Sequence, residues 1–151
     1  MVAAADVRVD RLGRADRERA RRTFELMDRV FEAQSEPVSD AYLEALLARP
    51  GFWALSATLG DEVVGGLTAH ELPMTRSEHI ELFVYDLAVR EDRQRRGIGR
   101  RLVEALLAGA AEAGIDVTFV PADDADDHAL AFYAALGGRP APVTMFDLGP
   151  A

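Results

Sequence analysis

The sequence predicts a single α/β (α+β) domain over residues 1–151, built on a central mixed β-sheet flanked by helices. Extended and helical patterns alternate in the second half of the chain, which indicates a parallel strand pair. A Gly60-Asp61 turn lies between two apolar runs and indicates an antiparallel hairpin before it. Apolar residues make up 49% of the chain, which allows a sizeable core.

The first half is expected to hold a strand, two helices and the hairpin. Apolar residues recur at helical spacing from Asp16 until Pro37 interrupts them, and Ser39 is a suitable N-cap for a second helix. The expected elements are a strand over Val7–Leu12, a helix from Asp16, a helix over Asp40–Ala48, and hairpin strands over Phe52–Leu59 and Val63–Ala69.

The second half is expected to add three strands and two helices. They are a long strand over Ile80–Val89, a helix over Arg96–Ala113, a buried strand over Val117–Val120, a helix from the N-cap Asp126 to Leu136, and a closing strand over Val143–Leu148. The predicted order is strand, helix, helix, strand, strand, strand, helix, strand, helix, strand.

Composition excludes several kinds of chemistry. The chain contains no cysteine and no lysine, which excludes disulfides, thiol nucleophiles, lysine Schiff bases and a P-loop lysine. Its three histidines show no HExxH spacing, so no metal is predicted. The net charge of -9 argues against nucleic acid as a partner and permits a cationic one. Neither a membrane-spanning stretch nor a secretory signal is recognised, so a cytoplasmic location is expected.

The most informative segment follows the long strand over Ile80–Val89. A turn there leads into a helix, Gly97 and Gly99 permit close approach of a ligand to the backbone, and six arginines lie between positions 90 and 101. The first amides of a helix form an anion site together with the helix dipole. The segment therefore predicts a phosphate-binding loop. A Rossmann fingerprint is excluded because position 102 is Leu where the third glycine would stand.

Gln94-x-x-Gly97-x-Gly99 resembles the pyrophosphate-binding motif of GCN5-related N-acetyltransferases (GNAT), and the predicted order of elements is similar to that fold. The resemblance implies acetyl-CoA as cosubstrate. It implies that the pyrophosphate is held by the loop and that the pantetheine arm pairs with the strand before it. It also implies that the strands over Ile80–Val89 and Val117–Val120 splay apart to admit the thioester. The cofactor-binding residues are then Leu87, Ala88, Val89, Gln94, Arg95, Arg96, Gly97, Ile98, Gly99 and Arg100.

Catalytic candidates follow from the reaction of an amine with a thioester. The Ala-Phe-Tyr-Ala segment matches the family pattern in which Tyr133 donates a proton to the leaving thiolate, for which a phenol is suited. A carboxylate must take the proton of the amine, and Asp86, Glu81 and the acidic cluster at 123–127 are candidates. Strand alternation predicts that Tyr85 and Asp86 face opposite sides of the sheet. The cluster is also explained in part by helix capping at Asp126.

A narrower resemblance covers nearly the whole chain. Tyr85-Asp86-Leu87-Ala88-Val89, the Ala122-Asp123 and Asp126-Asp127 pairs, and the closing Phe146-Asp147 are similar to the type I aminoglycoside 3-N-acetyltransferases. This implies acetylation of the 3-amino group of the 2-deoxystreptamine ring, and a homodimer. The resemblance also implies that Asp86, Asp123 and Asp126 contact the ammonium groups of the drug. Glu81 and Tyr85 of the same strand are added as substrate-binding candidates, and Tyr133, Asp86 and Asp123 are the catalytic candidates.

Two other functions are compatible with the sequence. The same chemistry could serve a polyamine or another small cationic amine, which would also explain the acidic residues. A non-catalytic acyl-CoA-binding sensor would bind the cosubstrate without turnover. The presence of Tyr133 and of the acidic cluster argues against the sensor.

Overall fold

Five strands form one mixed sheet in the order β1-β2-β3-β4-β5. The computed structural model describes residues 6–150, which divide after Pro121 into two compact units. The first unit contains β1 (Arg8–Arg11), η2 (Arg14–Asp16), α1 (Arg17–Val30), α2 (Asp40–Leu47), β2 (Phe52–Leu59), β3 (Glu62–Pro73), β4 (Ile80–Val89), η3 (Glu91–Arg93), α3 (Ile98–Glu112) and β5 (Val117–Phe119). The second contains α4 (Asp127–Ala135).

The strand pairing agrees with the predicted mixed sheet. The pairs β1–β2, β2–β3 and β3–β4 are antiparallel, and β4–β5 is parallel. Two boundaries differ from expectation by more than one residue. β3 continues to Pro73, four residues beyond the predicted end, and α3 begins at Ile98, two residues after the predicted start. The later start leaves Gln94 to Gly97 in the loop that precedes the helix.

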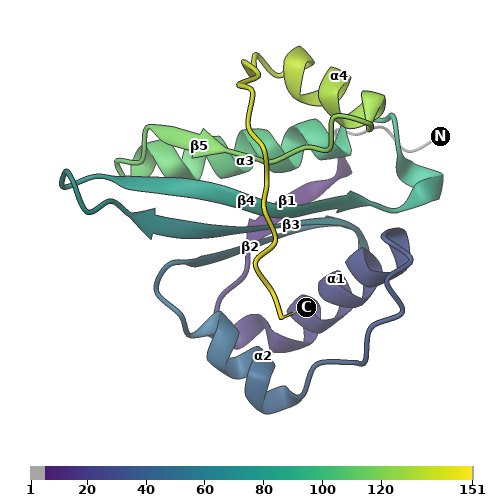
Figure 1. Cartoon of the computed structure of the whole chain (residues 1–151). Helices are drawn as coiled ribbons and strands as arrows, with labels where there is room; N and C mark the ends of the chain where they lie inside the picture. The colour runs from purple at the N-terminus through teal and green to yellow at the C-terminus, as the bar shows by residue number, and fades with distance from the viewer. Residues whose placement is uncertain (1–5, 151) are drawn as a thin grey trace. The chain divides into compact units, whose positions relative to one another are not determined.

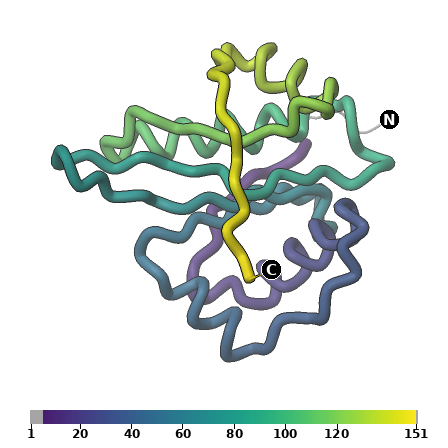
Figure 2. Tube along the Cα trace, in the orientation of Figure 1, coloured from purple at the N-terminus to yellow at the C-terminus, as the bar shows by residue number. Residues whose placement is uncertain are grey.

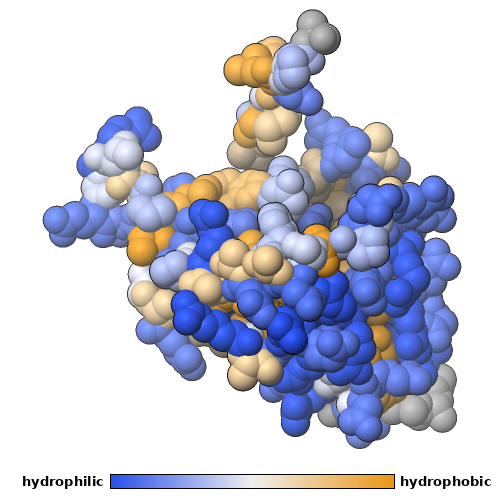
Figure 3. Space-filling view, turned by 90° about the horizontal axis from the view of Figure 1, so that it is seen from below, coloured by the Kyte–Doolittle hydropathy of each residue, from blue (hydrophilic) through white to orange (hydrophobic). Residues whose placement is uncertain are grey.

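Helices α1 and α2 cover one face of the sheet, and α3 covers the other (Figure 1). On the first face, Ala20 of α1 and Leu43 of α2 form a buried cluster with Ala54 of β2. The Thr23 hydroxyl of α1 donates to the Ser56 hydroxyl of β2 at 2.9 Å. Ser39 caps α2 by accepting from the Tyr42 amide, as predicted. The outer sides of α1 and α2 are largely hydrophilic (Figure 3), as expected of helices with one buried stripe.

The face under α3 has an apolar core that includes Trp53. Leu82 of β4 and Leu102 and Leu106 of α3 are fully buried. A Cβ added to Gly109 would lie 3.0 Å from the Trp53 ring, so this glycine lets α3 approach the sheet closely. The indole Nε1 of Trp53 donates to the Glu71 carboxylate at 2.7 Å, which satisfies the buried polar atom of that ring.

The second unit confirms one predicted element and contradicts another. Asp126 caps α4 as predicted, and Gly137, with φ 88°, ends the helix. The closing strand predicted over Val143–Leu148 is wrong, because no strand forms there. A period-2 pattern marks the two faces of a strand but supplies no partner for its hydrogen bonds. Pro140 and Pro142, which carry no amide hydrogen, also precede the segment.

Candidate functional site

The loop between β4 and α3 contains two residues with left-handed backbone. Arg95 and Gly97 both adopt left-handed conformations, with φ of 60° and 81°. The Nε2 of Gln94 donates to the Val89 carbonyl at 3.0 Å, which ties the loop to the end of its strand. The loop joins the end of β4 to the start of α3 at one end of the sheet (Figure 2). Successive backbone amides in left-handed turns form a concave nest for an anion.

The start of α3 adds amides to this nest. The Arg101 amide donates to the Gly97 carbonyl at 3.1 Å and so makes the first hydrogen bond of the helix. The amides of Ile98 and Gly99 precede that bond and belong to the turn in which a helix has no internal acceptor. Ile98 itself is buried and anchors the turn to the core.

Arg90, the first of the six arginines, is held by neighbouring acids rather than by the loop. Its guanidinium donates to the Asp92 carboxylate at 2.6 Å and lies 3.4 Å from Glu62. The hydrogen bond from Arg90 lowers the pKa of the Asp92 carboxyl. Arg90 therefore has a local structural role.

The outer edge of β4 opens beyond a short contact with β5. The two strands pair only where Glu81, Leu82 and Phe83 meet Val117, Thr118 and Phe119. In the part of the chain that the structure describes, β4 continues to Val89 with a partner on its β3 side alone. The pairing with β5 therefore ends six residues before the end of β4, and the splay implied by the family resemblance stays a prediction. The open edge carries Leu87, Ala88 and Val89, and leads directly into the loop.

A β-bulge corrects the predicted orientation of Tyr85 and Asp86. Thr68 pairs with Asp86 while Ala69 pairs with Val84, so Tyr85 is the extra residue of β4. The α1/α2 face contains Phe52 and its paired residues His70 and Phe83. Two residues farther along β2, the same face contains Ala54, which is paired with Thr68 and, through it, with Asp86. The prediction of opposite sides is wrong because a bulge interrupts strand alternation.

Tyr85 and Asp86 are consequently close to one another on the α1/α2 face. The Tyr85 ring is exposed and lies edge-on to His70 and Phe83, with centroid distances of 5.7 and 6.0 Å. Asp86 is half-buried, and burial raises the pKa of its carboxyl, while the charge of His70 acts in the opposite direction. A carboxyl with a raised pKa is better suited to accept a proton.

Glu81 and His70 belong to the same face. Glu81 lies in register with Leu72 of β3 and Val117 of β5, two residues before Phe83, and is half-buried. His70 was missed by the sequence analysis, which drew no inference from it. The register of β3 against β4 places this residue beside Tyr85 and Asp86. The sequence of a single strand does not reveal which residues of the neighbouring strand lie beside it.

The second unit contains the other predicted residues, Asp123, Asp126 and Tyr133. The Asp126 side chain accepts from the Ala129 amide at 3.0 Å, and the Asp123 side chain accepts from the Ala125 amide at 2.8 Å. Both carboxylates therefore stabilise the turn before α4, in agreement with the capping interpretation. Burial and the charge of Asp126 raise the pKa of the Tyr133 phenol, which keeps it protonated at neutral pH.

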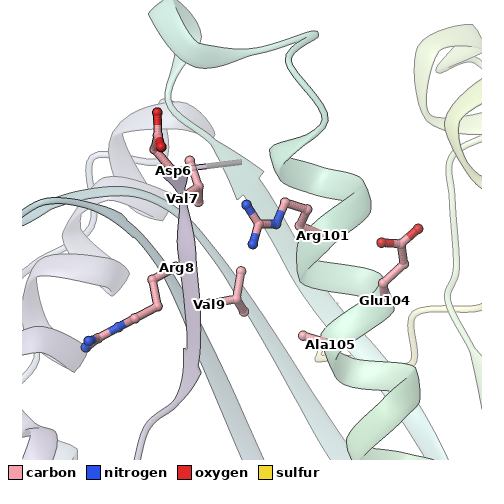
Figure 4. A pocket seen from close by; sticks show the side chains of 7 residues that line it. All are labelled: Asp6, Val7, Arg8, Val9, Arg101, Glu104 and Ala105. Carbon is pink, nitrogen blue, oxygen red and sulfur yellow. The ribbon is translucent and has the colours of Figure 1, made fainter. Parts of the chain in front are cut away.

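A surface groove of about 470 Å³ lies in the first unit (Figure 4). It runs between β1 and α3 and is lined by Asp6, Val7, Arg8, Val9, Arg101, Glu104 and Ala105. None of the predicted site residues lines it. Among residues 6–150, no cluster of His, Asp and Glu could hold a metal ion. No helix in that range is long and apolar enough to cross a membrane.

Comparison with known proteins agrees with these features. Two aminoglycoside acetyltransferases from uncultured soil metagenomic samples are similar to the chain in structure. One, meta-AAC0020 in complex with sisomicin, is 31% identical with a TM-score of 0.92, covering 97% of this chain and 98% of the other. The second, HMB0005, is 32% identical with a TM-score of 0.90, covering 96% and 99%.

A more distant structure shares the fold. AAC(6')-Iy, in complex with a bisubstrate analog, is 14% identical with a TM-score of 0.80, covering 96% of this chain and 99% of the other. A search of curated protein sequences gives no match. Residues 18–137 match the model of the acetyltransferase (GNAT) family. With the mixed sheet, the parallel β4–β5 pair and the glycine loop in place, this match shows that the chain belongs to the GNAT family of acetyltransferases.

Proposed function

We propose that the protein transfers the acetyl group of acetyl-CoA to an amino group of an aminoglycoside, at the 3-amine of the 2-deoxystreptamine ring. The observation that carries this proposal is the likeness, over 96% or more of the chain, to two aminoglycoside acetyltransferases at 31% and 32% identity. The position of the acetylated amine follows from the sequence resemblance alone, since an enzyme of the 6' class shares the fold.

The residues of the loop and of β4 fit acetyl-CoA. The nest at Arg95 and Gly97 and the amides of Ile98 and Gly99 would bind the pyrophosphate, and the glycines keep side chains out of its path. The open edge at Leu87–Val89 offers backbone donors and acceptors to the amide groups of the pantetheine arm. The cosubstrate supplies a thioester, whose carbonyl carbon the amine attacks with loss of the thiolate.

Four carboxylates and one phenol would bind the acceptor and transfer the protons. Asp86 and Glu81 share a sheet face and would bind ammonium groups. Asp86 would take the proton that the attacking amine must lose, since its raised pKa suits a base. Tyr133 would return a proton from its phenol to the thiolate. In this proposal Asp123, a catalytic candidate from the sequence, would bind a further ammonium group together with Asp126.

Thiol release from acetyl-CoA tests the function directly. The acceptors are gentamicin, neomycin, spermidine and a basic peptide, and the product is mapped by NMR. We expect release with gentamicin and acetylation of the 3-amine. Acetylation at another amine would contradict the position, release with spermidine alone would assign the protein to polyamines, and acetyl-CoA binding without turnover would indicate a sensor.

The Tyr133→Phe variant tests the proton donor. We expect kcat to fall by about 10- to 100-fold with the Kd for acetyl-CoA unchanged, because the ring remains and only the hydroxyl is lost. Tyr42→Phe is the matched control, since its exposed side chain lies on α2. Unchanged turnover in Tyr133→Phe would exclude this residue as the acid. Size-exclusion chromatography with light scattering tests the proposed homodimer.

A further inference from the structure

Four aromatic side chains stand in register across the α1/α2 face of the sheet. Phe52, His70, Phe83 and Phe119 are paired in turn across β2, β3, β4 and β5. The ring centroids of Phe52 and His70 are 5.2 Å apart, and those of Phe83 and Phe119 are 5.3 Å apart. This aromatic row begins in the core at the buried Phe52 and ends at the exposed Phe119. His70 is its only member that can carry a charge.

The position of His70 in the row is fixed on two sides. The Phe52 ring packs against it from β2, and the Tyr85 ring meets it edge-on at 79° from β4. The β4 bulge brings Asp86 to the same face, opposite Thr68, which precedes His70 by two residues on β3. His70 therefore lies at the boundary between the covered core and the carboxyl that the proposed reaction uses.

Other charged groups around Asp86 are farther away or face elsewhere. On β4, Glu81 lies on the same face beyond Phe83, and the phenol of Tyr85 adjoins His70. On β3, the Glu71 carboxylate accepts from the Trp53 indole on the α3 face.

Helices α1 and α2 present only uncharged side chains to this face among their buried residues, namely Ala20, Thr23, Leu26, Met27, Leu43 and Leu47. Burial raises the pKa of the Asp86 carboxyl, and the charge that opposes this rise is that of His70. In the described part of the chain, His70 is thus the charged partner of Asp86.

We propose that His70 is a positioning residue of the acceptor site, which orients Tyr85 and favours the ionised form of Asp86. This inference rests on the proposed function, because Asp86 is the base there. Imidazole is the side chain that gains a positive charge as pH falls below neutrality. A positive charge beside Asp86 keeps the carboxyl ionised, and so able to accept the proton of the amine, to lower pH than burial alone would permit.

The His70→Phe variant tests this role, because it keeps a ring in the row and removes the charge. We expect the acid limb of the pH profile of kcat/KM for gentamicin to move to higher pH. On the acid limb kcat/KM should fall by about 3- to 10-fold relative to wild type, and at pH 8.5 by less than about twofold. Protonation of the acceptor amine affects both proteins equally, so it cancels in the ratio of the variant's kcat/KM to that of wild type. The KM for acetyl-CoA should not change.

Two further variants separate charge from packing. His70→Gln keeps a polar side chain without a charge and should shift the acid limb of the kcat/KM profile to higher pH, as His70→Phe does. His79→Phe removes a different, exposed histidine from the loop before β4 and should leave the profile unchanged. A decrease in kcat/KM of the same size at every pH in His70→Phe would show that the ring only packs, and would overturn the proposal.

A titration without substrate distinguishes failure of this inference from failure of the proposed function. The ¹³C signal of the Asp86 carboxyl, followed by NMR in the folded protein, should titrate at higher pH in His70→Phe than in wild type. Such a shift would support the pairing of His70 with Asp86 even if no aminoglycoside is acetylated. An unchanged titration would refute the pairing even if gentamicin is a good substrate.

Discussion

The two faces of the sheet differ most where β4 crosses it. Toward α3, β4 presents Leu82 and Val84, whose exposed fractions are 0% and 4%. Toward α1 and α2 it presents the half-buried Asp86 and, through the bulge, Tyr85, which is 62% exposed. One strand thus contributes to an aliphatic core on one side and places a titratable carboxyl on the other.

The two faces of the sheet are therefore expected to differ in what they contribute, the α3 face to stability and the α1/α2 face to the proposed proton transfer. Close packing under α3 contributes free energy of folding in proportion to the apolar area removed from water. A half-buried carboxyl contributes little to stability, and its partial desolvation gives it a pKa suited to proton transfer. Changes on the α3 face should therefore alter unfolding and leave the chemistry intact, and changes at Asp86 should do the reverse.

The largest expected effect is on catalysis, in Asp86→Asn. The amide keeps the shape of the side chain and cannot take a proton, so we expect kcat/KM for gentamicin to fall by about 10²- to 10⁴-fold. Steady-state thiol release measures this, and the Kd for acetyl-CoA should stay within about twofold of wild type. Asp61→Asn, in the turn between β2 and β3, is the matched control. A wild-type rate in Asp86→Asn would remove this carboxyl from the mechanism and leave Glu81 as the candidate on this face.

Leu106→Ala tests the opposite face. Leu106 is fully buried, and its truncation should lower the free energy of unfolding by about 2–5 kcal/mol. Urea denaturation followed by circular dichroism measures the change. Leu107→Ala, at an exposed neighbour on the same helix, should cost less than about 1 kcal/mol. In the folded Leu106→Ala protein kcat should remain near wild type. A large loss of kcat under folding conditions would show that the two faces are not independent.

The sequence predicted the features that depend on residues close together in the chain. The loop at 94–99 is local: its glycines, its preceding strand and its following helix lie within about 20 positions, so pattern alone identified it. The capping residues Ser39 and Asp126 were found for the same reason. Features that depend on pairing between distant strands were missed. The bulge at Tyr85 and the proximity of His70 to Asp86 arise only when β3 and β4 are in register.

The wrong prediction of a closing strand has the same origin. Val143, Met145, Phe146 and Leu148 make the segment apolar, but an apolar segment describes side chains, whereas a strand exists through its backbone bonds to a neighbour. Those side chains are more than 70% exposed. By contrast, the short β5 was predicted to within one residue at its end, and β4 supplies its partner. The prediction that β5 is buried is wrong, because Val117 and Phe119 are exposed.

The smallest expected effect is the stability of Asp86→Asn as a function of pH. Burial raises the pKa of this carboxyl in the folded state, so the folded protein binds the proton more tightly than the unfolded chain does. Wild type should therefore lose stability as pH rises from the ordinary carboxyl pKa, about 3.9, through the raised folded value. The amide carries no charge and avoids this loss. Above that range we expect Asp86→Asn to melt about 1–2 °C higher than wild type, a small difference because solvent screens a half-exposed group. Below about pH 4 the two melting temperatures should converge. Calorimetry between pH 3.5 and 8 measures this difference. A variant that melts below wild type at every pH would identify Asp86 as a carboxylate whose contacts stabilise the fold, and the separation of stability from chemistry across β4 would then fail at its central residue.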